Sequence, residues 1–309
     1  MTQVFLLVSA LLLPAIAYAG EDQARTLVHQ GIARQYDLHL PSSLAPHPRP
    51  LVVALHGLGQ PVESLHAWLP LIPVADREGF AVAYPKALDG RWGYWPGARV
   101  FVPGQDANEV DDTGFIAAMV QSLVAEGIAD PARTYVTGVS RGALMAYTLM
   151  CARPDLFAAA APLSSGMTEA QVAACHPDRQ IPMLAVAGTA DPIQFYDGWL
   201  PSPPVPRLLS VPETMEFWRR QHGCEGQTIH QLPHRDRDDP TRTRRVEWTG
   251  CKAGGPVVLY KVIGGGHQPP SYSPNSEDTR RSFGRRGEDI ETAEEVWTLF
   301  SAASPVSAP

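Results

Sequence analysis

The sequence predicts an α/β fold, in which a mainly parallel sheet is covered by helices on both faces. Short apolar runs of strand length recur along the chain, and stretches with helical periodicity lie between them. Runs without polar alternation are typical of parallel strands that are buried on both faces, and strand–helix–strand repetition is typical of layered α/β proteins. The chain has 309 residues, 44% of them hydrophobic, so it can bury a large core in a single domain.

Each predicted element rests on a local pattern. Polar and apolar residues alternate over 25–29 and 34–40 on either side of Gly31, which predicts an antiparallel hairpin near the N-terminus. Six apolar runs are predicted to be the parallel strands, namely 51–55, 80–84, 134–137, 158–163, 183–187 and 257–263. Apolar residues at i, i+3 and i+4 predict helices at three places, namely 115–124, around Met215 and Trp218, and 290–300.

The remaining composition describes the loops and the surface. The polar segments 234–245 and 271–289 contain charges of both signs, which predicts solvated loops. Proline accounts for 30 of the 309 residues, and this high share predicts long ordered loops around the sheet. Acidic residues outnumber basic residues, 32 against 25, so we expect no nucleic-acid partner. Beyond the N-terminus, no apolar run reaches the roughly 20 residues of a membrane-spanning helix.

The N-terminus has the pattern of a secretory leader. An apolar run over 4–16 is too short to span a membrane, and it ends in Ala17-Tyr18-Ala19, with small residues at alternate positions. We expect cleavage after Ala19, so that 20–309 form a single mature domain in the extracellular space or the periplasm. Because no Lys or Arg precedes the run, a buried first helix or a membrane anchor is the alternative.

Four cysteines follow this leader: Cys151, Cys175, Cys224 and Cys251. An even number in an exported chain predicts two disulfides. Three pairings are open, and we favour the neighbours, Cys151 with Cys175 and Cys224 with Cys251. Each bond would close a loop of about 25 residues, worth about 3 kcal/mol in the chain-entropy description. Free buried thiols are the alternative, and because no CxxC or Cys/His spacing is present we expect no metal site.

The segment 135–142 contains the pattern G-x-S-x-G between a predicted strand and a helical stretch over 143–151. Flanking glycines relieve crowding in a sharp turn, and such a turn presents Ser140 above the sheet at the N-terminus of a helix. This placement makes the pattern much more specific than the five residues alone. Ser140 is therefore the predicted nucleophile, and an ordinary tight turn is the alternative.

A second turn follows the predicted strand 51–55, with the sequence His56-Gly57-Leu58-Gly59-Gln60. Small residues allow a backbone N–H group at such a turn to point at a developing oxyanion. We expect the oxyanion hole to consist of the N–H groups of Leu58 and Arg141, the residue after the nucleophile. His56 is either a second base or, as we favour, a histidine packed beneath the turn.

Asp191 and His267 each follow a predicted parallel strand, and three glycines precede His267. A carboxylate at a strand end can orient an imidazole, which then acts as a general base. Asp197 is the alternative acid. The chain order Ser140, Asp191, His267 is that of α/β-hydrolase triads, so the sequence predicts the α/β-hydrolase fold.

At these positions the chain resembles the secreted esterases grouped as polyhydroxybutyrate depolymerase-like, which include feruloyl and acetylxylan esterases. The resemblance covers nearly the whole mature chain. Beyond the four sites above, the matching segments are 51–57, Asp111-Asp112 before Phe115-Ile116, 153–158, Phe217-Trp218 before Gly223-Cys224, and Gly265-Gly266-His267.

The resemblance implies an α/β-hydrolase catalytic domain over 20–309 that needs no metal or organic cofactor. It implies Ser140 as nucleophile, His267 as base and Asp191 as the orienting acid, with the oxyanion held by the N–H groups of Leu58 and Arg141. The partner is then an ester substrate. A non-catalytic polysaccharide- or polyester-binding protein and a serine peptidase of the same fold are the alternatives.

Two departures from the family bear on the substrate. Gln268-Pro269-Pro270 follows His267, where similar sequences often have Trp-Pro, so the sequence leaves that pocket wall open. No binding module or linker is recognisable, which favours small or soluble esters such as hydroxybutyrate oligomers, or feruloyl and acetyl esters of plant cell-wall polysaccharide. Four loop aromatics are candidates either for an acyl pocket or for buried loop anchors: Trp92, Tyr94, Trp95 and Trp199.

Overall fold

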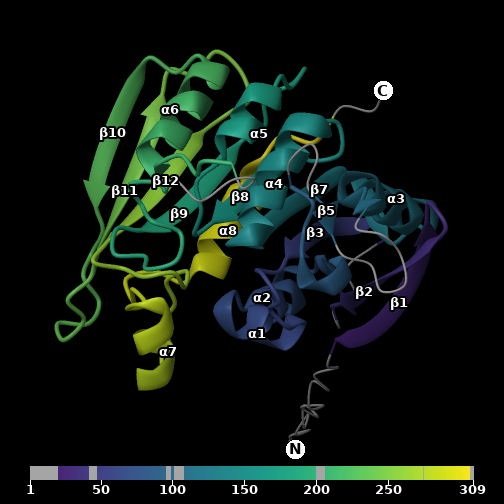
Figure 1. Ribbon diagram of the computed structural model, residues 1–309, viewed down its shortest axis with the longest axis horizontal. Helices are drawn as coiled ribbons and strands as arrows, with labels where there is room; N and C mark the ends of the chain where they lie inside the picture. Colours follow the sequence, from purple (N-terminus) through teal and green to yellow (C-terminus); the bar gives the residue numbers. More distant parts are fainter. Residues whose placement is uncertain are drawn as a thin grey trace, which may run out of the picture.

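A ten-stranded sheet runs through the protein in the computed structural model (Figure 1). The structure describes residues 20–41, 47–94, 99–100, 108–199, 206–273 and 275–306, with the backbone alone at 99–100 and 108–109. The predicted leader over 1–19 and Trp95 lie outside the described residues. The strand order is β1-β2-β4-β3-β7-β8-β9-β12-β11-β10.

Six neighbouring strands in the middle of this sheet are parallel. They are β4 (Ala81–Pro85), β3 (Arg49–Leu55), β7 (Ala129–Val139), β8 (Ala159–Leu163), β9 (Met183–Gly188) and β12 (Val257–Ile263). Each coincides with one of the six apolar runs, so the predicted mainly parallel sheet is confirmed. Outside the first half of β7, their residues are almost all buried, because helices cover both faces and leave no solvated side for polar residues.

Antiparallel strands close the sheet at both edges. The predicted N-terminal hairpin is β1 (Glu21–His29) and β2 (Ile32–Leu40), which pairs with β4. At the opposite edge lie β11 (Arg242–Thr249) and β10 (Gly226–Gln231). A separate small ribbon consists of β5 (Arg99–Val100) and β6 (Asn108–Glu109).

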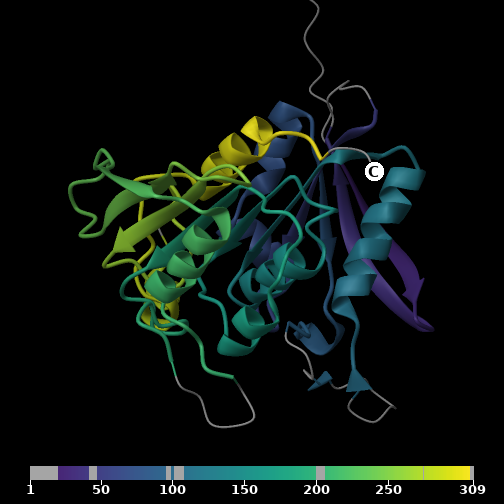
Figure 2. The same ribbon diagram turned by 90° about the horizontal axis from the view of Figure 1, so that it is seen from above.

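The helices form two layers, and alternate residues of each strand face one layer or the other. In β3, Leu51, Val53 and Leu55 belong to the core cluster on the side of the sheet covered by α3 (Asp112–Ala125), α4 (Arg141–Ala152) and α6 (Val211–His222). Val52 and Ala54 of the same strand pack with α1 (Val62–Trp68), α2 (Leu71–Glu78) and α8 (Thr292–Ala302). In Figure 2 the yellow α8 and the blue helices lie on one side of the sheet, with the teal and green helices on the other. No helix in the described ranges is long and apolar enough to cross a membrane.

The prediction of a solvated loop over 234–245 is wrong at its end, because β11 begins at Arg242. Thr243 is buried and Arg244 is exposed, which is the alternation of an antiparallel strand with one solvated face. Three of the four residues 242–245 are arginines, so the segment contains no apolar run that would predict a strand.

The prediction of a solvated loop over 271–289 is also wrong in part. This segment contains α7 (Glu277–Phe283), whose first turn is capped by the Ser276 side chain. None of the α7 residues is buried, so no apolar periodicity marks the helix. Arg286, which follows it, is buried, and Figure 1 shows α7 protruding from the body beside the loop that connects it to the sheet.

The N-terminus of α3 is joined to the hairpin by paired acids that the sequence singled out. Asp111 caps the helix by accepting the Gly114 N–H at 2.7 Å. Asp112 is buried and accepts from Arg34 of β2 at 2.5 Å and from the Gly93 N–H at 2.7 Å. Burial raises the pKa of Asp112, although Arg34 and the Gly93 N–H act to lower it. These two carboxylates therefore have a structural role here.

Candidate active site

Ser140 forms the turn between β7 and α4. Its φ and ψ are 60° and −117°, a combination that L-residues adopt rarely and that recurs where function requires a strained turn. A Cβ atom at Gly138 would lie 2.4 Å from the Gly142 carbonyl oxygen, and one at Gly142 would lie 2.1 Å from the Leu55 carbonyl oxygen. Only glycine fits on both sides of Ser140, which explains the G-x-S-x-G pattern.

We expect Gly142→Ala to lower the free energy of unfolding by about 3 kcal/mol or more, because the new Cβ would overlap main-chain oxygens that cannot rotate away. Gly31→Ala is the control: Gly31 has φ 77° and nothing within 4 Å of its would-be Cβ, so only about 1 kcal/mol of backbone strain is expected there. Urea denaturation of both variants measures the difference. Equal losses would contradict the close approach at Gly142.

Asp191 and His267 are joined by a buried hydrogen bond. His267 Nδ1 lies 2.7 Å from Asp191 Oδ2, and the two residues are only 2% and 5% exposed. The other oxygen of Asp191 accepts the N–H groups of Ile193 and Gln194 at 2.8 and 2.9 Å, which fixes the carboxylate. This arrangement places the proton on Nδ1 and leaves Nε2 free to accept one.

The alternative acid, Asp197, is exposed and makes no hydrogen bond to His267 in the described part of the chain. Asp191 is buried at the turn after β9, whereas the side chain six residues later is exposed to solvent. Between the two aspartates, the geometry therefore favours Asp191.

Ser140, Asp191 and His267 follow β7, β9 and β12, which lie within the run β7-β8-β9-β12 of one sheet. Main-chain hydrogen bonds continue across these strand ends, from Ser140 N–H to Leu163 O at 2.9 Å and from Ala190 N–H to Gly265 O at 2.8 Å. The three side chains therefore share the carboxyl edge of the sheet. Among the described residues the Ser140 hydroxyl has no hydrogen bond to His267, and catalytic hydrogen bonds are often long or absent in proteins without bound substrate.

The turn after β3 lies directly against Ser140. A Cβ atom at Gly57 would lie 3.5 Å from the Ser140 Cβ. The Gln60 side chain accepts the Gly57 N–H at 2.8 Å, whereas the N–H of Leu58 has no acceptor within the described ranges. Arg141 is the first residue of α4, where N–H groups have no partner within the helix. Both candidate oxyanion donors therefore lie beside Ser140. No sequence pattern marks the hydrogen bond between Gly57 and Gln60.

His56 is packed beneath this turn and is not a second base. Its Nδ1 lies 2.7 Å from the Gly57 carbonyl oxygen, and its Nε2 accepts the Ala87 N–H at 3.1 Å. Both ring nitrogens are therefore used, and the Nε2 contact requires an unprotonated nitrogen. Trp92 is buried over the same residue and donates to the His56 carbonyl oxygen at 2.9 Å.

We expect the protein to lose stability as the pH falls below about 6.5, the ordinary histidine pKa. Burial lowers the pKa of His56 and of His222. Their stabilising contribution is complete above the unfolded pKa and is lost as the pH falls toward the folded pKa, by up to about 1.4 kcal/mol per pH unit for each group. Urea denaturation at pH 7.5 and 5.5 measures the loss.

His222→Gln should reduce this difference between the two pH values, while the same change at the exposed His176 should leave it unaltered. A pH difference that is the same in all three proteins would contradict the assignment to buried histidines.

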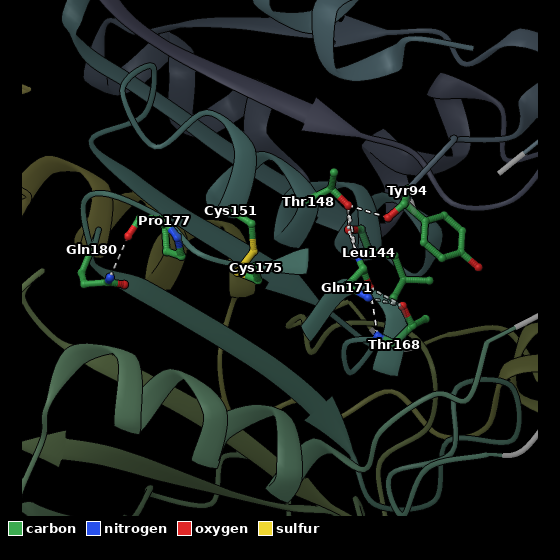
Figure 3. Close-up of a disulfide and its surroundings, with 9 residues drawn as sticks. All are labelled: Tyr94, Leu144, Thr148, Cys151, Thr168, Gln171, Cys175, Pro177 and Gln180. Carbon is green, nitrogen blue, oxygen red and sulfur yellow. Dashed lines mark hydrogen bonds between the residues drawn. A yellow bond between two sulfur atoms is a disulfide. The ribbon is translucent and has the colours of Figure 1, made fainter. Parts of the chain in front are cut away.

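Both disulfides join neighbouring cysteines, Cys151 with Cys175 and Cys224 with Cys251, and the structure has no free cysteine among the described residues. The first bond ties the end of α4 to the end of α5 (Glu169–Ala174). Figure 3 shows the hydrogen bonds beside it, from Gln171 to the Leu144 carbonyl oxygen and the Thr148 hydroxyl at 2.6 and 2.9 Å. The helix that follows Ser140 is thus held by α5 at Leu144, Thr148 and Cys151.

The four candidate pocket aromatics differ in their placement. Trp92 and Tyr94 are buried and anchor their loop, whereas Trp199 is half-exposed. Trp68 and Phe283 were not anticipated, and both lie beside His267: Trp68 meets its ring edge-on, with centroids 6.0 Å apart, and Phe283 stacks at 6.3 Å. Together these two rings form an aromatic wall beside His267. Trp68 is far from His267 in the chain, so no sequence pattern marks this contact.

Two cavities bear on where a ligand could bind. One of 440 Å³ lies beside the turn after β3 and is lined by residues that include His56, Gln60 and Lys86. A larger one of 610 Å³ lies between α3 and the start of β7, at the opposite end of that strand from Ser140. Neither cavity is lined by Ser140, Asp191 or His267, but the smaller one shares the turn after β3 that lies against Ser140. The described residues include no cluster of three or more His, Cys, Asp or Glu side chains that could hold a metal ion.

A family profile described as "Esterase PHB depolymerase" matches residues 34–200, more than half of the chain. The chain belongs to the PHB depolymerase esterase family. It is therefore a carboxylic ester hydrolase. This family membership confirms the resemblance drawn from the sequence.

Relatives of this esterase family member differ in length. One relative is NocK of Nocardia uniformis subsp. tsuyamanensis, whose name describes it as an esterase. The two chains are 32% identical over an alignment that covers 80% of this chain and 74% of NocK. XynS20E of Neocallimastix patriciarum is named a bifunctional acetylxylan esterase/xylanase. It is 28% identical over 78% of this chain, and the matched part spans 32% of the length of XynS20E. The acetyl xylan esterase structure from Aspergillus awamori superposes with a TM-score of 0.62 at 18% identity, covering 91% of this chain and 99% of that one. That likeness confirms the α/β-hydrolase fold.

Proposed function

We propose that this esterase is a serine hydrolase that transfers an acyl group in two steps through Ser140, His267 and Asp191. The observation that carries the proposal is the buried hydrogen bond of 2.7 Å between His267 Nδ1 and Asp191 Oδ2, on the same sheet edge as the strained Ser140 turn. A fixed imidazole with a free Nε2 is the base that an alkoxide nucleophile requires.

In the first step, His267 Nε2 takes the Ser140 hydroxyl proton while the oxygen attacks the ester carbonyl carbon. The carbonyl oxygen becomes an oxyanion, held by the N–H groups of Leu58 and Arg141. When the C–O bond to the alcohol breaks, the alcohol oxygen takes the proton from Nε2 and leaves an acyl-enzyme. Water then repeats the sequence, giving its proton to Nε2, and the acid departs as the proton returns to Ser140.

The proposed substrates are soluble or small esters, such as hydroxybutyrate oligomers or feruloyl and acetyl esters of plant cell-wall polysaccharide. Two features support this choice: the family membership and an aromatic wall beside His267, made by Trp68 and Phe283. We also propose that residues 20–309 are one catalytic domain, exported after cleavage behind Ala19. The two disulfides support export, because such bonds persist in oxidising compartments.

Hydrolysis of methyl ferulate and of a soluble 3-hydroxybutyrate trimer by the purified mature protein tests this function, with Ser140→Ala as control. We expect turnover of at least one of the two esters. Preference for ferulate would place the enzyme with cell-wall esterases, and preference for the trimer would place it with oligoester hydrolases. Failure on both esters, together with no labelling of Ser140 by a fluorophosphonate, would favour a binding protein on the same fold.

A further inference from the structure

The segment 283–287, here named the histidine strap, runs alongside the loop that carries His267. The Gly266 N–H donates to the Arg285 carbonyl oxygen at 2.6 Å, and the Ser271 N–H donates to the Gly287 carbonyl oxygen at 3.0 Å. Between these two bonds, the His267 N–H donates to the Phe283 carbonyl oxygen at 2.6 Å. The strap therefore supports the loop on both sides of the histidine.

Arg286, in the middle of the strap, connects this loop to a second element. It is 7% exposed. Its Nε donates to the Pro269 carbonyl oxygen at 2.8 Å, two residues after His267. Its Nη2 donates to the carbonyl oxygens of Trp68 and Ala67 at 2.7 and 3.4 Å, at the end of α1. One planar group thus bridges the histidine loop and the helix end that carries Trp68.

The bonding partners of Arg286 are unusual for a buried cation. In the described part of the chain no carboxylate lies within ion-pair distance of Arg286. Its guanidinium donates to three main-chain oxygens, and the charges of Glu291 and Glu288 act on it only from a longer distance. Two of the three oxygens are terminal carbonyls of α1, where a cation is favoured by the helix dipole. An apolar side chain would fill the same space without the cost of burying a charge. Space filling alone therefore does not explain an arginine at position 286, whose charged guanidinium donates hydrogen bonds in two directions.

The contacts of the Trp68 ring explain why this bridge matters at the site. Trp68, whose carbonyl oxygen Arg286 binds, lies edge-on to His267 and packs against Phe283 with centroids 4.8 Å apart. Any movement of the α1 end relative to the histidine loop would change the packing around the imidazole. Arg286 opposes this movement because its fork binds both elements at once.

We propose that Arg286 is a positioning residue for the reaction, which holds His267 and its Trp68 wall in register through the Pro269 and α1 carbonyls. The inference rests on the proposed function, in which His267 is the base. A base displaced by about 1 Å can lose about 100-fold in rate. Arg286 contacts neither substrate nor reacting atoms, so its effect should fall on kcat more than on KM.

The test compares Arg286→Lys and Arg286→Met with Arg281→Met, an exposed arginine on α7 whose ion pair is with Glu277 of the same helix. We expect Arg286→Met to lower kcat about 10- to 100-fold with KM changed less than about threefold. Arg286→Lys should fall between it and the wild type, since an ammonium keeps the charge but lacks the fork. Labelling of Ser140 by a fluorophosphonate should slow in parallel, and Arg281→Met should behave as wild type.

All rates are measured well below the melting temperature of each variant. If Arg286→Met does not fold, the test rests on Arg286→Lys. A kcat of Arg286→Lys within twofold of wild type would then overturn the proposal. A loss confined to KM, or unchanged labelling alongside reduced kcat, would overturn it as well. Failure of the proposed function is separate, because it would appear as wild-type protein that neither turns over esters nor reacts with the fluorophosphonate.

Discussion

Replacing Ser140 with alanine is expected to lower kcat by about 10⁶-fold and to leave the fold intact. The hydroxyl is the only nucleophile in the proposed mechanism, and nothing else on the turn can form the acyl-enzyme. The change removes no hydrogen bond between described side chains, because the Ser140 hydroxyl makes none. Alanine also meets the same positive φ of 60° as serine, so the strain of the turn is unchanged.

Ester hydrolysis and thermal melting of the same preparation measure both parts of this prediction. The melting temperature should stay within a few degrees of wild type. Residual turnover above the rate in water is expected at about 10³- to 10⁴-fold, because the oxyanion donors remain. A Ser140→Ala protein with wild-type turnover would end the proposal that Ser140 is the nucleophile.

Replacing Asp191 with asparagine is expected to lower kcat by about 10⁴-fold. The asparagine amide would donate to His267 Nδ1, which forces the proton onto Nε2 and removes the lone pair that takes the serine proton. The fold of the turn should persist, since the asparagine oxygen can still accept the Ile193 and Gln194 N–H groups. The pH dependence of kcat and the melting temperature are measured together.

Asp197→Asn is the matched control, because it makes the same chemical change on the same loop at an exposed side chain. Its kcat should stay within about twofold of wild type. If Asp197→Asn were the variant that lost activity, the assignment of the orienting acid would pass from Asp191 to Asp197.

The local pattern of the chain predicted most of the sheet. Parallel strands buried on both faces leave uninterrupted apolar runs, and all six were found within a few residues of their bounds. The same reading missed β11 and α7, because their residues are charged or exposed and their order depends on pairing and capping instead of on apolar periodicity. It also missed α1, which is short and ends at Trp68.

The sequence by itself determined the candidates for the chemistry, because each has a local signature: glycines on both sides of Ser140, and strand ends before Asp191 and His267. Only the tertiary structure shows that Asp191, and not Asp197, is bonded to His267, since this depends on which carboxylate reaches an imidazole 76 residues along the chain. The same is true of Trp68 and Arg286. Their contacts with the histidine loop cross between elements distant in sequence, and such contacts leave no periodicity or spacing in the chain.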